Sequence, residues 1–274
     1  MPRGNTGFPA PSGRTELIVL LLVSACAFAA VPLALGGIGL GWDALNHHVY
    51  LGWIADELRF DRDFQAASGQ STQYPYLYWP LYKLVSAGWS GPSAGVLLVL
   101  FNLVAVPPLW MLARAGVPEA SWYGVAMRWL AVALAFLTGV VLSLFDSTSN
   151  DLLAAIPLVW AIALAIAPLE SASRRRLPVR RTLLLSGLCA GAAVAFKFSN
   201  GPLALVLPLA WCMHGRGLRQ RLVHVAWGCA ATVAGFALFY GWWGWQLWTH
   251  YGNPLYPFCE NWFGPLRAYL GWRP

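Results

Sequence analysis

Residues 17–40 read LIVLLLVSACAFAAVPLALGGIGL, an apolar run without a charged side chain. A helix needs about 20 consecutive apolar residues to cross the hydrocarbon core of a bilayer. The run is longer than a typical signal-peptide core and lacks a convincing cleavage site. The stretch therefore predicts a retained membrane-spanning helix.

The composition extends this prediction to the whole chain, which is 58% hydrophobic, 11% charged and contains 16 Trp. A soluble domain could not cover itself with so little polar surface. The fold class expected is an all-α polytopic transmembrane bundle, with the lipid bilayer as its first partner. The five cysteines show no CxxC spacing, so as small core residues they need no metal or disulfide.

Apolar runs separated by polar or charged turns predict about seven spans in a single transmembrane domain, 1–274. Residues 1–16 form a cytoplasmic tail, 41–91 a long first outer loop with short interfacial helices, and 249–274 an outer C-terminal segment. Lys197 and the residues after it break the longest run into two short spans or a re-entrant pair. The expected spans are about Leu17–Leu40, Ser93–Ala113, Ser121–Phe145, Asp151–Pro168, two segments within Thr182–Met213, and Leu222–Trp248.

Charge fixes an expected orientation. The net charge of +7 favours a nucleic-acid partner at first sight, but the arginines occupy short loops beside apolar runs, as the positive-inside rule predicts. No nucleic-acid partner is therefore expected, and Arg128, inside a span, should face the bundle or reach the inner surface. The N-terminus is placed in the cytoplasm and the C-terminus outside. Eight of the 11 acidic residues then fall on the outer side: Asp43, Asp56, Glu57, Asp61, Asp63, Asp146, Asp151 and Glu260.

The outer side offers a first candidate pair in Asp43 and His47. A carboxylate just past the first span can act as a general base or bind a metal ion. Four residues separate the two side chains, so a helix would place them on one face, within reach of one ion or substrate. The alternative is that Asp43 only caps the helix that follows it.

A second candidate pair is Asp151 and Lys197. Asp151 opens the fourth span, where Ser149, Asn150 and Asp151 are all good N-cap residues, so capping alone is the competing interpretation. Lys197 lies at a helix break between apolar segments, where an unpaired cation is costly. It either reaches outward to a lipid headgroup or meets another anion, and a phosphate fits that role.

Taken together, these residues resemble the C-type fold of membrane glycosyltransferases, which take a sugar from a polyprenyl-phosphate carrier. Protein mannosyltransferases, the lipid A aminoarabinose transferase and oligosaccharyltransferase catalytic subunits belong to that group. The resemblance rests on the order of features along nearly the whole chain, and the last of them looks like a motif of bacterial members. These features are Gly41-Trp42-Asp43, the Tyr-Pro-rich stretch Tyr74–Tyr82, Asn150-Asp151, Lys197-Phe198-Ser199 and the string Tyr251–Phe258.

The resemblance implies a glycosyltransferase of the bacterial inner membrane that moves a sugar from a polyprenyl-phosphate donor to an acceptor on the outer face. It implies catalytic roles for Asp43, as the base, and Asp151, as a supporting carboxylate or metal ligand. It implies substrate-binding roles for Lys197, Tyr74 and Asn253 beside His47. A divalent metal is compatible with the reaction but not required by the sequence.

Two departures from the family pattern keep alternatives open. The first-loop acid is a single Asp rather than an Asp-Glu pair. The chain also stops just after the seventh expected span, which is the pattern expected of an N-terminal fragment or of an inactive truncated transferase. The competing classes are a transporter and a non-catalytic scaffold. A transporter should show inverted repeats and mid-membrane charges, and neither is evident.

Overall fold

The computed structural model describes residues 10–167 and 178–272, and within these ranges every regular element is a helix. Four helices are long and apolar enough to cross a membrane: α1 (Gly13–Leu35), the run Gly91–Gly116, α9 (Val179–Phe196) and α12 (Leu218–Tyr251). The prediction of an all-helical chain is confirmed for the described residues, and these four candidate spans are consistent with a membrane protein.

The remaining apolar helices are shorter or bent. Helices α6 (Trp122–Phe136) and α7 (Gly139–Phe145) would form a fifth span together, but they meet at an angle of 69°. Helix α8 (Asp151–Ile166) and the run Phe198–Cys212 are apolar but short. The run Gly91–Gly116 is itself divided into α4 (Gly91–Leu100), a 3-10 turn and α5 (Val106–Gly116).

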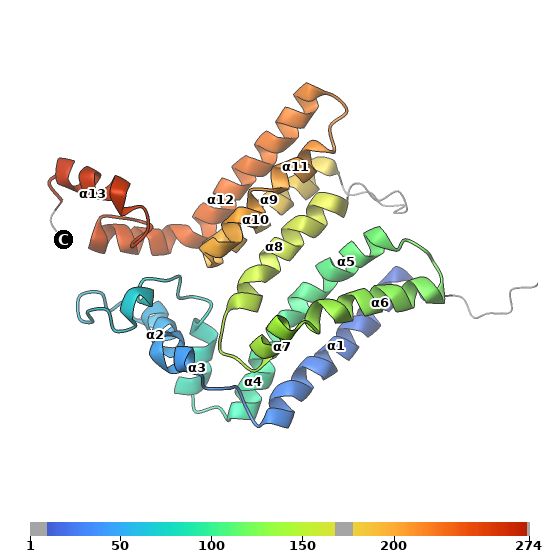
Figure 1. Ribbon diagram of the computed structural model, residues 1–274, viewed down its shortest axis with the longest axis horizontal. Helices are drawn as coiled ribbons and strands as arrows, with labels where there is room; N and C mark the ends of the chain where they lie inside the picture. The colour runs from blue at the N-terminus through green and yellow to red at the C-terminus, as the bar shows by residue number, and fades with distance from the viewer. Residues whose placement is uncertain (1–9, 168–177, 273–274) are drawn as a thin grey trace, which may run out of the picture.

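The two ends of the bundle differ in charge (Figure 1). Helices α1, α6, α9 and α12 begin, and α5, α8 and α11 (Leu207–Cys212) finish, at what we call the basic end. Arg14, Arg114 and the arginines at the starts of α9 and α12 lie there. The opposite, acidic end carries Asp43, Asp146 and Asp151, so the predicted sorting of charge is present in the fold.

The first helix is shifted relative to its predicted limits. The Ser12 hydroxyl accepts a hydrogen bond from the backbone of Thr15, and α1 begins at Gly13, four residues before Leu17. It ends at Leu35 because Gly36 adopts a left-handed conformation (φ 80°), which suits glycine. The helix therefore includes part of the segment assigned to the N-terminal tail.

The longer start of α1 places Glu16 inside the bundle. Its carboxylate accepts hydrogen bonds from Arg128 Nε and Nη2, both at 2.7 Å, and from Trp110 Nε1 at 3.0 Å. Arg128 therefore faces the bundle, as predicted, and ties α6 to α1, while Trp110 adds α5. A buried ion pair with its hydrogen bonds satisfied is costly to break, because removing one partner leaves an uncompensated buried charge.

Helices α9 and α12 pack closely against each other. A Cβ at Gly191 would overlap the backbone carbonyl of Thr232, so glycine is required for this approach. Small residues let two apolar helices approach closely where lipid removes the hydrophobic driving force. The Ser186 hydroxyl on α9 donates to the carbonyl of Ala161 on α8 at 2.6 Å and accepts from Trp211 Nε1 on α11 at 3.0 Å.

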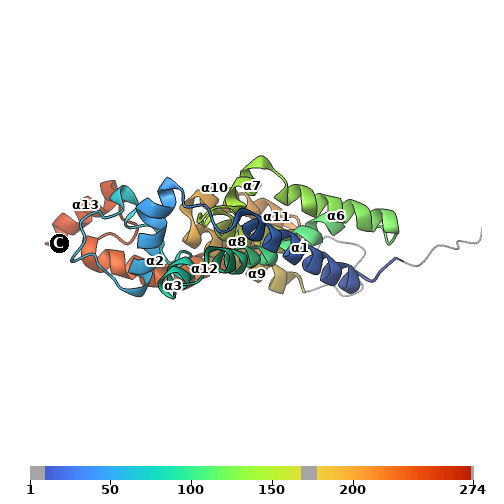
Figure 2. The ribbon, with the colours of Figure 1, turned by 90° about the horizontal axis from the view of Figure 1, so that it is seen from below.

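The segment 41–91, which the sequence analysis assigned to a first outer loop, contains short helices. They are a π-helical turn at Ala44–His48, α2 (Val49–Asp56), a 3-10 turn at Ser68–Gln70 and α3 (Trp79–Ser86). Helix α13 (Glu260–Tyr269) follows α12. The elongated molecule, seen from below in Figure 2, gathers α2, α3 and α13 at one end.

Candidate functional site

The centre of the candidate site is an ion pair between Asp151 and Lys197. Asp151 is the first residue of α8, and Lys197 follows the last turn of α9, which ends at Phe196. The Lys197 amino group donates to Oδ1 of Asp151, and the Ser149 hydroxyl donates to Oδ2 at 2.6 Å. Both side chains remain partly open, at 39% exposure for Lys197 and 43% for Asp151.

Local structure explains why the Asp151 carboxylate is free for this pairing. The backbone N–H of Asp151 donates to the Ser149 hydroxyl at 3.2 Å, and Asn150, at the N-cap position, makes no side-chain cap. Ser149 thus satisfies one free amide at the start of α8. At the other partner, Asn200 donates to the carbonyls of Ala154 on α8 and Ala193 on α9, which holds the helix break at Lys197 against α8.

A second cluster, around Asp43, His47 and His48, lies near the start of segment 41–91. His47 Nδ1 lies 3.8 Å from Oδ1 of Asp43, so the two side chains share a face, as their spacing predicts. The Asp43 side chain is 62% exposed and makes no capping hydrogen bond, whereas the His47 side chain is 5% exposed. Asp43 is therefore an open carboxylate next to a buried imidazole.

His48 connects the two clusters. Its Nδ1 lies 2.6 Å from the Thr148 hydroxyl, one residue before Ser149, and its ring stacks on Tyr78 with centroids 4.7 Å apart. Burial and the neighbouring His47 lower the pKa of His48 to about 4, while the charges of Asp43 and Asp151 act in the opposite direction. Both carboxylates therefore lie near enough to act on one imidazole, which is neutral at pH 7.

Burial also lowers the pKa of His47, against the raising effect of Asp43. A neutral imidazole can donate from one ring nitrogen and accept at the other. Within residues 10–167 and 178–272, no group of three or more His, Cys, Asp or Glu side chains is arranged to hold a metal ion.

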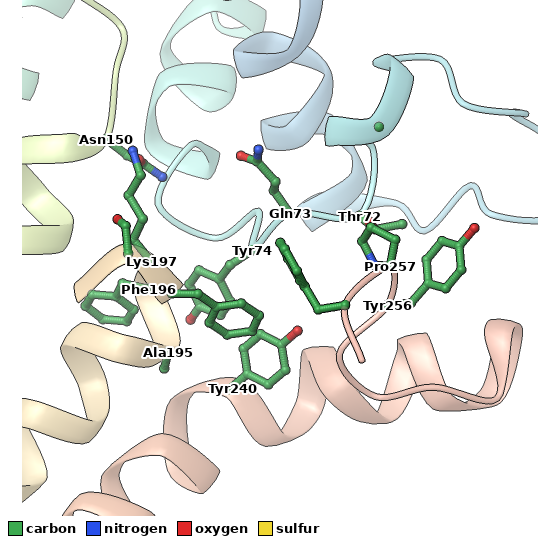
Figure 3. A pocket seen from close by; sticks show the side chains of 14 residues that line it. Thr72, Gln73, Tyr74, Asn150, Ala195, Phe196, Lys197, Tyr240, Tyr256 and Pro257 are labelled. Carbon is green, nitrogen blue, oxygen red and sulfur yellow. The ribbon is translucent and has the colours of Figure 1, made fainter. Parts of the chain in front are cut away.

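A cavity of about 230 Å³ opens beside Lys197 (Figure 3). Lys197 extends from the end of α9 toward Asn150, and aromatic rings from α9, from α12 and from the segment before α3 also line the cavity. Tyr74 stacks on Phe196 and Tyr240, with centroids 5.6 and 6.2 Å away. The lining residues are Gly69, Thr72, Gln73, Tyr74, Asn150, Ala195, Phe196, Lys197, Phe198, Ser199, Tyr240, Tyr256, Pro257 and Phe258.

A hydrogen bond between α12 and the segment before Tyr74 holds one wall of this cavity. Trp243 Nε1 on α12 donates to the carbonyl of Thr72 at 3.1 Å, which fixes the segment carrying Tyr74. Burial raises the pKa of Tyr74 to about 12, so its hydroxyl keeps its proton at neutral pH. The wall therefore offers rings and neutral hydroxyl donors rather than charge.

Asn253 organises the loop that supplies Tyr256, Pro257 and Phe258. The side chain is fully buried, and its amide donates to the carbonyl of Phe258 at 2.8 Å and to Glu260 at 2.6 Å. Its own oxygen accepts from the backbone of Leu255 at 2.9 Å. The side chain is thus occupied by internal bonds and is not among the cavity-lining residues.

The structure therefore brings Tyr74 and Lys197 to the cavity, and Asp151 is bonded to Lys197. Asp43 and His47 do not line the cavity. His48, whose ring contacts His47 and whose Nδ1 bonds Thr148, lies between them and Asp151. Sequence analysis named Ser149 only as an N-cap candidate and assigned no site role to Thr148 or Tyr240. Tyr78 and Tyr256 entered only as members of the stretches Tyr74–Tyr82 and Tyr251–Phe258. The polar turn 146–150 between two apolar runs was the available signal for Thr148 and Ser149. The tyrosines share their pattern with an ordinary aromatic belt.

Comparison of the chain with protein-family models, with curated proteins and with solved structures finds no match.

Proposed function

We propose that the chain is a seven-span membrane glycosyltransferase of the C-type that uses a polyprenyl-phosphate sugar. In this arrangement the acidic end faces outward, in the bacterial case into the periplasm, and the basic end faces the cytoplasm. The alternation of helix directions and the sorting of arginines to one end support this topology. The seven crossings comprise the four long spans, the bent pair α6 and α7, α8, and the run Phe198–Cys212.

The chemistry needs one base and one cation. Asp43 takes the proton of the acceptor hydroxyl, whose oxygen attacks the anomeric carbon of the sugar. The bond from that carbon to the phosphate oxygen breaks, and the phosphate leaves with the bonding electrons. Lys197 stabilises the charge that develops on the leaving phosphate.

The observation that carries the proposal is the position of Lys197. Among the described residues that line the cavity, it is the cation, and its anionic partner is Asp151. A phosphate that enters the cavity can share or replace Asp151 as the partner of this amino group. Tyr74, Phe196 and Tyr240 offer faces on which a sugar ring or an isoprenoid can pack.

The test is a transfer assay with membranes that contain the chain. Labelled polyprenyl-phosphate sugars are supplied, and the label is followed into acceptor while released polyprenyl phosphate is measured. We expect release above that of membranes lacking the chain. No release with any sugar donor would contradict the proposal and favour a scaffold.

A further inference from the structure

A groove of about 550 Å³ lies at the basic end, along the first turns of α12. It is far from the cavity beside Lys197, which lies at the opposite end of α9 (Figure 1). Its lining combines positive, aromatic and aliphatic side chains. These residues are Gly217, Leu218, Arg219, Gln220, Val223, His224 and Trp227.

Among the described residues, the positive charges around this groove have no acidic partner. The guanidinium of Arg180, at the start of α9, lies over the ring of Trp227 at 5.0 Å. Arg180, Arg216 and Arg219 are exposed, and in the described part of the chain neither they nor Arg221 form an ion pair with a carboxylate. Helix α12 begins without a side-chain cap, and the positive end of its dipole adds to this charge.

The length of α12 bears on the level of the groove in a bilayer. The helix has 34 residues, which at 1.5 Å per residue gives about 50 Å, against a hydrocarbon core of about 30 Å. A helix of this length extends past the core, and the arginines at its start favour placing its first turns at the level of the lipid headgroups. Leu218 and Leu222, at 74% and 61% exposure, present apolar surface to the acyl chains next to the arginines.

We propose that this groove is a binding site for an anionic phospholipid. The guanidiniums of Arg180 and Arg219 contact the headgroup phosphate, and Trp227 with Leu222 packs against the upper acyl chain. Basic pockets between membrane helices are suited to such headgroups, and planar guanidinium groups pair with phosphate through two hydrogen bonds. The proposal rests on the proposed topology, in which the start of α12 lies at the lipid headgroups. It does not require the transfer reaction proposed at the acidic end.

The test is native mass spectrometry of the full chain released from nanodiscs that contain phosphatidylglycerol, cardiolipin or phosphatidylcholine. The unsubstituted chain should retain the anionic lipids over phosphatidylcholine. The double variant Arg180→Gln/Arg219→Gln should lower the retained anionic lipid by about tenfold or more, since a charge-assisted hydrogen bond contributes roughly 1.5–3 kcal/mol. The single variant Arg219→Gln should lower the retained anionic lipid by a smaller factor. Because Arg219 is exposed, this change should leave the fold intact, so its loss of lipid cannot be attributed to misfolding.

The matched control is Arg114→Gln. Arg114 also lies at the basic end and over a Trp ring, at 5.3 Å from Trp110, but does not line the groove. The control should retain lipid like the unsubstituted chain. Equal loss in the control, no loss in the Arg219 variants, or retention of phosphatidylcholine at the anionic level would each overturn the proposal. Displacement of the lipid by millimolar inorganic phosphate would identify a free-phosphate site and would also overturn it.

Discussion

Lys197 and Asp151 form an ion pair across 46 residues of sequence, between the end of one apolar helix and the start of another. Neither charge is fully buried, so the pair is open to exchange of partners. An exposed pair of this kind contributes little to stability, roughly 0–1 kcal/mol. The pair is therefore better placed to serve chemistry than to hold the fold.

Replacing Lys197 by methionine should lower sugar transfer by about 100-fold, because loss of one group that stabilises developing charge costs roughly that factor. The thermal midpoint in detergent should change little. The matched control is Lys83→Met, which removes an exposed lysine paired with Asp56 in the first outer loop. Transfer by the Lys197 variant at the level of this control would remove Lys197 from the mechanism.

The stability of the folded chain should fall as the pH falls from 6.5 toward 4. His48 has a pKa of about 4 when folded and 6.5 in its ordinary state, so below pH 6.5 protons bind preferentially to the unfolded state. The full effect is about 3 kcal/mol at 1.36 kcal/mol per pH unit. Thermal midpoints measured from pH 7 to pH 4 should show the loss, and His48→Gln should flatten it, while His250→Gln should not.

Replacing Gly191 by alanine should destabilise the contact between α9 and α12 by about 1–3 kcal/mol, the usual cost of overpacking. A Cβ there would meet the backbone of Thr232, which cannot move aside. Gly201→Ala is the matched control, since nothing lies within 4 Å of its Cβ position. Thermal unfolding in detergent compares the two, and equal midpoints would show that the helices are not in close contact.

Replacing Asn253 by alanine should loosen the loop that carries Tyr256 to Phe258. The change removes the part-buried hydrogen bonds that Asn253 makes with the N–H of Leu255 and the carbonyl of Phe258, at about 0.5–1.5 kcal/mol for each bond lost. Limited proteolysis should then cut between α12 and α13. Asn261→Ala, an exposed position on α13, is the control and should remain protected. Equal protection of both variants would show that Asn253 does not hold the loop.

Much of the helical architecture could be predicted from sequence, because apolar runs and the charged loops between them are local features of the sequence. The break at Lys197, the capping turn before Asp151 and the shared face of Asp43 and His47 were all predictable on that basis. The partner of Arg128 was not, because Glu16 precedes the apolar run and joins it only when α1 starts at Gly13. The ends of helices depend on capping and packing interactions, and the pattern of apolar residues along the sequence does not report these.

The role of Asn253 shows a second reason for incomplete prediction. A short polar residue after a long span fits ligand binding and loop formation equally well in sequence. Only the three-dimensional arrangement reveals that its amide is bonded to Phe258 and Glu260. Likewise, the cavity joins residues from the first outer loop, α9, α12 and the loop after it, and no local pattern reports that such segments meet.

The orientation should be readable by cysteine labelling in a background without the five native cysteines. Probes at Gln70 and Ala268, both at the acidic end, should react with an impermeant reagent from outside. A probe at Ala120, in the exposed turn between α5 and α6, should react only after the membrane is permeabilised. Gln70 and Ala268 on opposite sides would exclude a single outer site.

The most direct test of the account is sugar transfer by Asp43→Asn compared with Asp61→Asn. Asp43 and Asp61 are both exposed acids of the first outer loop, with side chains 62% and 67% exposed, so the two changes remove equivalent surface charge. The account predicts that Asp43→Asn abolishes release of polyprenyl phosphate while labelling at Gln70 stays unchanged, and that Asp61→Asn releases it at the unsubstituted rate. Full release by Asp43→Asn would contradict the assignment of Asp43 as the base.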